Sequence, residues 1–252
     1  MAAKVIFENL ILKGMNKGGT LKPDEKGYYP CVVGVLGADD SIGEHYSIND
    51  RVRQVFANSS QLNRRAAEGL LRGEFGHPDP MQYANQLAFE IRVRRIDEKS
   101  ESHHIRKVWL EEGEIDGRKV TLIMADVRPQ GPYGKFLKDA LDNPDCNVAF
   151  SGRYYSNPSK VGNKVYREIY AVGTFDYVTE PGLRGSTKYN SPQLQSASVL
   201  MLDIHQIQSI VGAEKSMSSQ LRQQTMQSGG LTAQQLYGDI VPQHKPRKAL
   251  TF

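Results

Sequence analysis

The stretch SHHIRKVWLEEGEIDGRKVTLIM, residues 102–124, decides the fold class of this 252-residue chain. Apolar residues concentrate in 105–110 and in 119–127, on either side of the segment EEGEIDGR. The dipeptide Asp116-Gly117 within that segment favours the tight turn of a β-hairpin. We therefore predict two antiparallel strands here, within a mostly β body.

Further apolar runs outside this hairpin are typical of strands. They cover residues 4–12, 31–36, 147–155 and 164–178. Another segment, 86–96, alternates in polarity, with Leu87, Phe89, Ile91 and Val93 opposite charged residues. Because side chains alternate between the two faces of a strand, this pattern predicts a half-buried strand.

Two segments are expected to form helices. Residues 59–72 are rich in Ala and Leu, can be capped by Ser59 or Ser60, and stop at Gly73. A shorter helix is expected at 135–141. Helices beside mostly antiparallel strands give the fold class α+β.

The character of the sequence changes after Gly182. Residues 193–211 have the apolar spacing of a helix, whereas 215–235 are rich in Ser, Gln and Gly and are expected to be mobile. We therefore predict a folded body at 1–185, a helical extension at 186–214 and a mobile basic tail at 215–252.

The tail accounts for the whole formal charge of the chain, which is +4. It holds five Lys or Arg residues and one Asp, so residues 1–214 are formally neutral and give no electrostatic reason to expect nucleic-acid binding. No apolar run approaches the roughly 20 residues that span a bilayer, and the first residues lack the features of a signal peptide. Cys31 and Cys146 match no zinc or paired-thiol spacing, as expected for reduced intracellular thiols.

His77 is the first candidate for chemistry. None of the six histidines shows the spacing of a metal site, so neither a metal nor another cofactor is expected. His77 lies in GEFGHPDP, residues 73–80, where Gly73 and Gly76 permit sharp turns and Pro78 stiffens the exit. Such a turn can hold an imidazole in one orientation, and a plain surface histidine is the alternative.

Ser151 is the second candidate, in NVAFSGRYYS, residues 147–156. The small Gly152 leaves room for a substrate backbone, and the amides of Gly152 and Arg153 can donate to an oxyanion. The alternative is a strand serine followed by a bulge glycine.

Asp176 is the third candidate, in an otherwise apolar segment where an unpaired carboxylate is costly. A bond from His77 to Asp176 would satisfy this carboxylate and fix the tautomer that accepts a proton from Ser151. Glu168 is the second choice, because strict alternation places it on the same side of the strand. A surface carboxylate or an Arg partner is the alternative for either residue.

Together these segments resemble a known family. In order along the chain they are GEFGHP (73–78), the 102–124 stretch, PYGKFLKDAL (132–141), VAFSGRYY (148–155) and FDYVTEP (175–181). The order is similar to that of the prohead, or capsid maturation, serine proteases of tailed phages, jumbo-phage members included, which are distantly related to herpesvirus assemblins. The resemblance covers about residues 55–185, and implies an assemblin-like β-barrel core with surrounding helices.

The resemblance also implies roles for the candidates. His77 matches the family's base and Ser151 its nucleophile. The third member in the phage branch is acidic and matches Asp176. In the herpesvirus branch it is a histidine, which only His103 or His104 could supply here, from a different segment.

The implied activity is a serine endopeptidase that cuts scaffold proteins, the major capsid protein and its own tail after Glu, at small-x-Glu sites. The sequence Gly212-Ala213-Glu214 fits this rule and predicts self-cleavage between Glu214 and Lys215. Ala66-Ala67-Glu68 also fits but lies in a predicted helix. A cationic residue is expected to bind the side chain of the substrate Glu, and the candidates are Arg153, Arg94 and Lys135.

The resemblance places the protein inside the viral prohead in the host cytoplasm, with no membrane and no specific nucleic acid as partners. A non-enzymatic internal scaffold or capsid protein is the alternative function. A nucleic-acid binder with a basic tail is weaker, because the body is neutral.

Overall fold

A computed structural model describes most of the chain between residues 21 and 178. The described ranges are 21–39, 43–115, 118–143, 145–146 and 148–178, with the backbone alone at 3–7, 10–11, 114–115 and 200–202, and single residues 208, 209, 212 and 235. The predicted boundaries at 185 and 214 lie outside these residues and stay predictions. None of the described helices is long and apolar enough to cross a membrane.

The smaller of two sheets is built on the predicted hairpin. Its strand order is β3 (Tyr29–Leu36), β8 (Arg118–Pro129), β7 (Glu101–Ile115) and β6 (Arg72–Glu74), and all its pairings are antiparallel. Strands β7 and β8 pair from His103↔Pro129 to Ile115↔Arg118, which confirms the prediction from residues 102–124.

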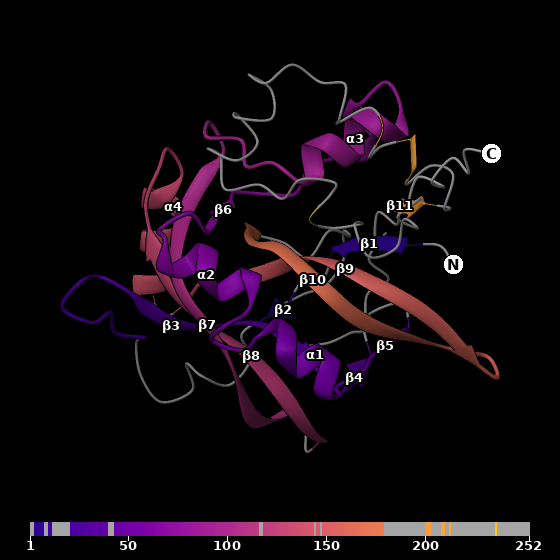
Figure 1. The fold of residues 1–252 in the computed structure, drawn as a ribbon. Coiled ribbons are helices and arrows are strands. Elements are labelled where there is room, and N and C mark those ends of the chain that lie inside the picture. The colour runs from indigo at the N-terminus through magenta and orange to yellow at the C-terminus, as the bar shows by residue number, and fades with distance from the viewer. Residues whose placement is uncertain are drawn as a thin grey trace, which may run out of the picture.

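The larger sheet contains the segments of Ser151 and Asp176. Its strand order is β11 (Leu200–Leu202), β1 (Ala3–Phe7), β9 (Ala149–Val161), β10 (Lys164–Val178), β5 (His45–Tyr46) and β4 (Ala38–Asp39), and β2 (Leu10–Ile11) pairs with β9. Of the pairings between the described strands of this sheet, only that of β5 with β10 is parallel. The long β9–β10 hairpin extends past the other strands (Figure 1). The predicted α+β class with mostly antiparallel strands is confirmed.

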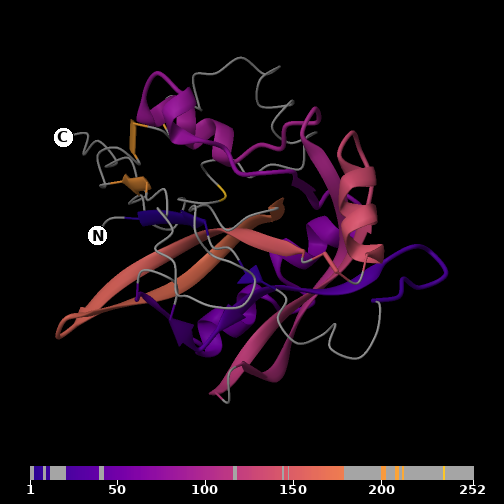
Figure 2. The same ribbon diagram turned by 180° about the vertical axis from the view of Figure 1, so that it is seen from behind.

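The two sheets meet where β6 approaches β10. Phe75 forms a parallel bridge with Tyr177, and a Cβ on Gly73 would lie 2.2 Å from the Phe175 carbonyl oxygen, so only glycine allows this approach. The sheets thereby curl into a half-barrel, which Figure 2 shows from behind.

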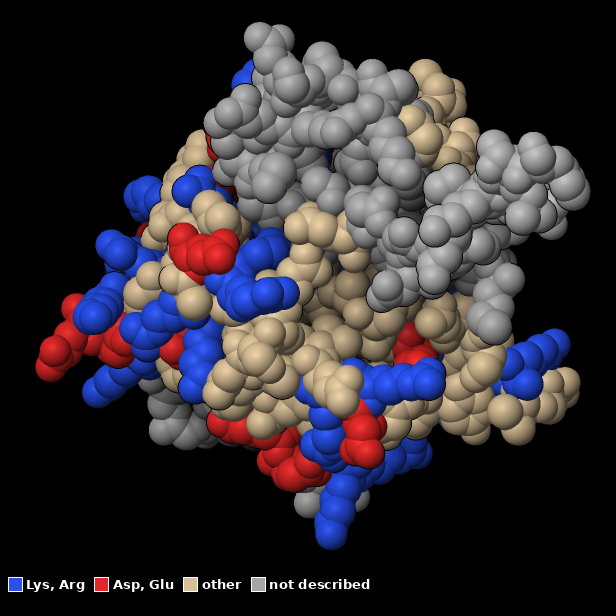
Figure 3. Space-filling model, in the orientation of Figure 1, with Lys and Arg blue, Asp and Glu red and all other residues tan. Residues whose placement is uncertain are grey.

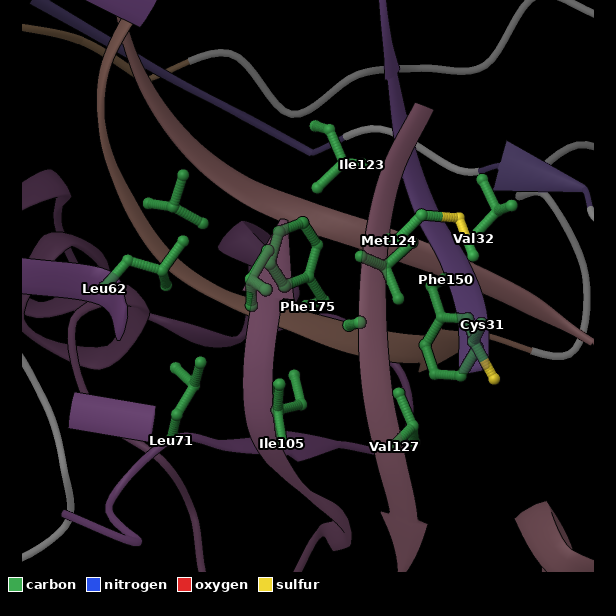
Figure 4. Packing of buried hydrophobic residues seen from close by; sticks show 14 of the residues in the cluster. Cys31, Val32, Leu62, Leu71, Ile105, Ile123, Met124, Val127, Phe150 and Phe175 are labelled. Carbon is green, nitrogen blue, oxygen red and sulfur yellow. The ribbon is translucent and has the colours of Figure 1, made fainter. Parts of the chain in front are cut away.

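The core lies between the inner faces of the two sheets. Phe150 and Phe175 of the larger sheet are fully buried among residues of the smaller one, including Ile105 and Met124 (Figure 4). Tyr154 fills the gap between two glycines: a Cβ on Gly152 or on Gly34 would come within 2.2 Å of its ring or hydroxyl.

Among the described residues, four α-helices and one short 3-10 helix accompany the sheets. They are α1 (Asp50–Val55), α2 (Gln61–Ala67), η1 (Pro80–Gln82), α3 (Gln86–Val93) and α4 (Gly134–Asp142). Helix α1 packs on β10, α2 on β7 and β10, and α4 on β7 and β8. On the face in Figure 3, acidic and basic side chains of the described residues are interspersed, in keeping with a neutral body.

The predicted strand at 86–96 is wrong, because these residues form α3. The Asn85 side chain caps the helix by accepting a hydrogen bond from the Ala88 amide at 2.9 Å. Phe89 and Val93 are four residues apart and both buried, so one helical face explains their burial as well as alternation does. The alternation of apolar residues favoured a strand, although Asn85 is a good helix N-cap.

Two helix predictions need smaller corrections. The helix expected at 59–72 is capped by Ser60, as predicted, but α2 ends at Ala67, and Arg72 already belongs to β6. Within the helix expected at 193–211, residues 200–202 instead form β11, where the edge of β1 supplies backbone partners.

Candidate active site

Backbone hydrogen bonds hold the turn that carries His77, and one of them joins it to the end of β10. The Phe75 amide donates to the Ser100 carbonyl oxygen and the Gly76 amide to that of Tyr177, each at 2.8 Å. Gly76 has a φ of 78°, a conformation that favours glycine, and it reverses the chain before His77. The Asp79 carboxylate then accepts from the Met81 amide at 2.9 Å and caps η1. The glycine-rich turn therefore holds His77 beside β10, as the sequence predicted.

His77 and Asp176 are in direct contact. The Nδ1 atom of His77 lies 2.9 Å from Oδ2 of Asp176. The side chain of Asp176 is fully buried, and that of His77 is 19% exposed. This bond joins the turn at 73–80 to the strand that ends near Val178, and brings two of the three predicted residues together.

The charge state of Asp176 determines which atom of this pair carries the proton. Burial opposes ionisation, but the Arg153 guanidinium and the bond from His77 outweigh it, so the pKa of the carboxyl lies well below its usual range. An ionised carboxylate only accepts hydrogen bonds, so Nδ1 of His77 donates. In the neutral ring Nε2 is then the acceptor, as a general base for Ser151 requires.

Ser151 lies beside Asp176 in the sheet. The two residues are Cα partners in the antiparallel ladder of β9 and β10, so their side chains project from the same face. The strict alternation of β10 breaks between Val172 and Phe175, where the register shifts, and the pairing with Ser151 depends on this bulge. Ser151 is fully buried, and its Oγ has no hydrogen-bond partner among the described residues. The structure thus gathers Ser151, His77 and Asp176, without a direct Ser151–His77 bond.

Gly152 and Arg153 lie in the interior of β9, where Gly152 is the Cα partner of Phe175 in β10 and Arg153 that of Phe7 in β1. Gly152 must also be small for a structural reason, since the ring of Tyr154 occupies the place of its Cβ; room for a substrate backbone stays a prediction. An oxyanion role for the two amides stays a prediction.

The three cations considered for a Glu pocket are all engaged in ion pairs. Arg153 is fully buried, and its Nε lies 2.7 Å from Asp176 Oδ2. Arg94 is 5% exposed and pairs with Glu90 at 2.9 Å. Lys135 is exposed and pairs with Asp139 at 2.6 Å. The guanidinium groups of Arg153 and Arg94 are therefore poorly placed to bind a substrate carboxylate.

Glu168, the second choice for the acidic member, lies toward the other end of β10. Its Oε2 accepts from Asn49 Nδ2 at 2.6 Å, and Arg51 lies 3.6 Å from its Oε1. Two register shifts of β10 lie between Glu168 and Asp176, but their Cα partners in β9, Asn157 and Ser151, are six residues apart, so the two acids still share a side. Glu168 is nevertheless eight residues from Asp176 along an extended strand, too far away to orient His77, which contacts Asp176.

His103 and His104 have other partners. The buried His103 places Nδ1 2.8 Å from Ser102 Oγ and packs edge-on against Phe150. Burial lowers its pKa to about 4, so it is neutral near pH 7. His104 Nδ1 lies 3.0 Å from the Tyr28 hydroxyl. Asp176 is therefore the residue that contacts His77.

The remaining predicted sites lie elsewhere. Glu214 and Lys215 are outside the described residues, so self-cleavage there stays a prediction. Ala66 and Ala67 form the last turn of α2 and Glu68 its C-cap, as expected for a site inside a helix. Among the described residues no group of three or more His, Cys, Asp or Glu could hold a metal ion.

The sequence matches known proteins over most of its length. Residues 7–239 match the Peptidase S80 family. The chain belongs to this family. It is a protease. The capsid maturation protease of Pseudomonas phage phiKZ is 33% identical over 199 residues, which are 77% of this chain and 72% of that protein. The structure of the bacteriophage T4 capsid assembly protease is similar at a TM-score of 0.43 and 13% identity, over 71% of this chain and 99% of that one.

Proposed function

We propose that this S80 peptidase is a serine endopeptidase of phage capsid maturation that works through Ser151, His77 and Asp176. The observation that carries the proposal is the 2.9 Å contact of His77 with Asp176, the residue directly opposite Ser151 in the sheet. Three segments far apart in the sequence meet there, with the acid buried and the base partly exposed. Nucleophile, base and orienting acid are the components of acyl transfer.

In the proposed reaction His77 Nε2 takes the proton of Ser151 Oγ as the oxygen attacks the scissile carbonyl carbon. Asp176 keeps the proton of His77 on Nδ1 throughout. Collapse of the tetrahedral intermediate breaks the C–N bond, and His77 protonates the leaving amine. Water then attacks the acyl group on Ser151, with His77 again as the base. Substrate binding must first bring Ser151 Oγ and His77 into hydrogen-bond reach, as happens in many enzymes.

Stabilisation of the oxyanion is assigned to backbone amides near Gly152 and Arg153. Removal of one such donor typically costs about 100- to 1000-fold in rate. The assignment rests on their place directly after Ser151 in the chain, beside the position proposed for the substrate carbonyl oxygen, on which the charge develops.

The proposed substrates are scaffold and capsid proteins inside the prohead, together with the enzyme's own tail. The phiKZ relative, at 33% identity, is named a capsid maturation protease, which supports this setting. Cleavage after Glu at small-x-Glu sites, including Glu214, is part of the proposal. Membership of a peptidase family favours an enzyme over a non-enzymatic scaffold protein.

The test is cleavage of a purified scaffold peptide that contains one small-x-Glu site, followed by mass spectrometry. Ser151→Ala should abolish cleavage, both of this peptide and after Glu214, while the melting temperature changes little. Ser156→Ala is a matched control: it removes a second fully buried hydroxyl from the same strand, which also has no hydrogen-bond partner among the described residues. Equal cleavage by wild type and Ser151→Ala would refute the proposal.

A further inference from the structure

The guanidinium of Arg153 uses all of its hydrogen-bonding capacity behind the proposed active site. Its Nε and Nη2 donate to the two carboxylate oxygens of Asp176, at 2.7 and 2.9 Å. Nη2 also lies 3.1 Å from Glu74 Oε2. Nη1 donates to the carbonyl oxygens of Val93 and Arg95, at 3.1 and 2.9 Å. Arginine has five N–H donors, and these five contacts match them.

Glu74 contacts both Arg153 and Asp176 and helps to hold the pair in place. Its carboxylate receives Arg92 through two contacts of 2.9 and 2.5 Å and the Asp97 amide at 2.7 Å. Its own backbone amide donates to Asp176 Oδ1 at 3.1 Å. Glu74 is 1% exposed and lies three residues before His77 in the turn. The residue therefore connects Arg92 of α3, Arg153 of β9 and Asp176 of β10.

Asp176 has four hydrogen bonds as a result. They come from Arg153 twice, from the Glu74 amide and from His77. A carboxylate offers about four lone-pair sites, so every direction is occupied and the group cannot rotate without losing a bond. The bidentate contact with an arginine fork is also the geometry that specifies carboxylate orientation best.

The charges of this cluster balance one another, and of the four groups only Arg92 is partly exposed, at 18%. Arg153 and Arg92 contribute two positive charges, and Asp176 and Glu74 contribute two negative ones. Burial disfavours the Arg153 cation, but Asp176 and Glu74 more than compensate and raise its pKa. Asp176 therefore has a cation on one side and His77 on the other. In a triad without such a cation, the aspartate charge directly stabilises the imidazolium.

We propose that Arg153, held by Glu74 and by the end of α3, is a positioning residue that aims the Asp176 carboxylate at His77 and offsets its charge. The proposal rests on the Ser151–His77–Asp176 assignment. Arg153 does not contact substrate in this role.

No other described charged group near the cluster supplies the positive charge that offsets Asp176. His103 of β7 lies near Asp176, but its pKa of about 4 leaves it uncharged over the working range. Arg92 of α3 is paired with Glu74, and so is the backbone amide of Asp97. The compensating charge next to Asp176 is therefore that of Arg153.

The test compares three variants with a matched control. Arg153→Met removes the fork and its charge. Arg153→Met with Glu74→Gln removes one charge of each sign, so the buried cluster is neutral again. Arg153→Lys keeps a charge but lacks the fork. The control is Arg167→Met, because Arg167 is 2% exposed and makes a bidentate pair with Glu44, at 2.7 Å twice, away from His77.

The readouts are kcat and KM of peptide cleavage, with melting temperature measured in parallel. Both Met variants should lose about 100-fold in kcat with KM almost unchanged, since misplacement of a catalytic group by about 1 Å costs that much. Arg153→Lys should lose at least about tenfold in kcat, again with KM almost unchanged. Arg167→Met should lower the melting temperature and leave kcat and KM in place.

Each outcome supports or overturns the inference. A kcat within about threefold of wild type in Arg153→Lys, or in a folded Met variant, overturns it, and so does a loss of kcat/KM that appears in KM rather than in kcat. If neither Met variant folds, Arg153→Lys decides through kcat alone. Wild type and Ser151→Ala are measured alongside: absence of Ser151-dependent cleavage would refute the proposed function itself, whereas unchanged Arg153 variants of an active Ser151 enzyme refute only the positioning role.

Discussion

Strand β10 carries an acidic residue toward each end, and only one of them meets a histidine and a serine. At the Val178 end Asp176 is fully buried, contacts His77 and lies opposite Ser151. Toward the other end the side chain of Glu168 is 29% exposed and contacts Asn49 and Arg51 on the surface. Both ends also have a buried arginine with a bidentate carboxylate partner. A buried ion pair therefore does not distinguish the proposed site. The site is distinguished by the turn that brings His77 to Asp176 and by the strand register that places Ser151 opposite Asp176.

The largest expected effect is a difference in kcat between variants of Asp176 and of Glu168. Asp176→Asn should lower kcat by about 10⁴-fold, because an amide at this position favours the wrong tautomer of His77. Glu168→Gln should stay within about threefold of wild type. Peptide cleavage by both variants measures this difference. A large loss in Glu168→Gln together with a small loss in Asp176→Asn would reverse the assignment.

A smaller effect is expected from glycines near the two ends. A Cβ on Gly73 would lie 2.2 Å from both the Phe175 carbonyl oxygen and the ring of His103, so Gly73→Ala must push β6 and the His77 turn away from β10. We expect at least a tenfold loss of kcat, since about 1 Å of displacement can cost 100-fold.

Gly43 is the matched control for this displacement. It has a φ of 80° and nothing within 4 Å of a Cβ, so Gly43→Ala should cost about 1–2 kcal/mol of stability and no activity. Melting curves and cleavage rates of the two variants check both values. Full activity in Gly73→Ala would mean that the spacing of β6 and β10 does not position His77.

The smallest effect is the acid dependence of folding at the Asp176 end. The pKa of Asp176 is lower in the folded protein than in the unfolded chain, where it is about 3.9, because Arg153 and His77 stabilise the charge against the effect of burial. Its contribution to stability is therefore complete above about pH 4 and is lost as pH falls toward the folded value. The unfolding free energies of wild type and Asp176→Asn should converge below about pH 4. Denaturant titrations at several pH values test this, and a constant difference down to pH 2 would contradict it.

The sequence was most informative where local chemistry and pairing agree. The turn signal Asp116-Gly117 and its flanking apolar runs predicted the pairing of β7 with β8, which the structure shows from His103↔Pro129 to Ile115↔Arg118. Gly76 before His77 indicated a sharp reversal, and the reversal is present. These features depend on neighbouring residues, so they can be predicted from a single chain.

Long-range features were less accessible. Arg153 was considered for the substrate, but its partners Glu74 and Asp176 are distant in sequence, and only the fold brings them to a buried arginine. Strict alternation suggested Glu168 as a rival to Asp176, and only the fold shows that His77 meets β10 at Asp176, whereas Asn49 and Arg51 meet it at Glu168. The strand predicted at 86–96 failed because the Asn85 cap was outweighed by a short alternating pattern. An Asn directly before a short alternating run, as at Asn85, is therefore a signal for a helix.

Covalent labelling tests the central claim most directly. Wild-type enzyme treated with a fluorophosphonate, then digested and mapped by mass spectrometry, should carry one adduct on Ser151 and none on Ser156. The adduct should disappear in His77→Ala and form far more slowly in Asp176→Asn. Cleavage activity without an adduct on Ser151, or labelling of Ser151 that is independent of His77, would contradict the account.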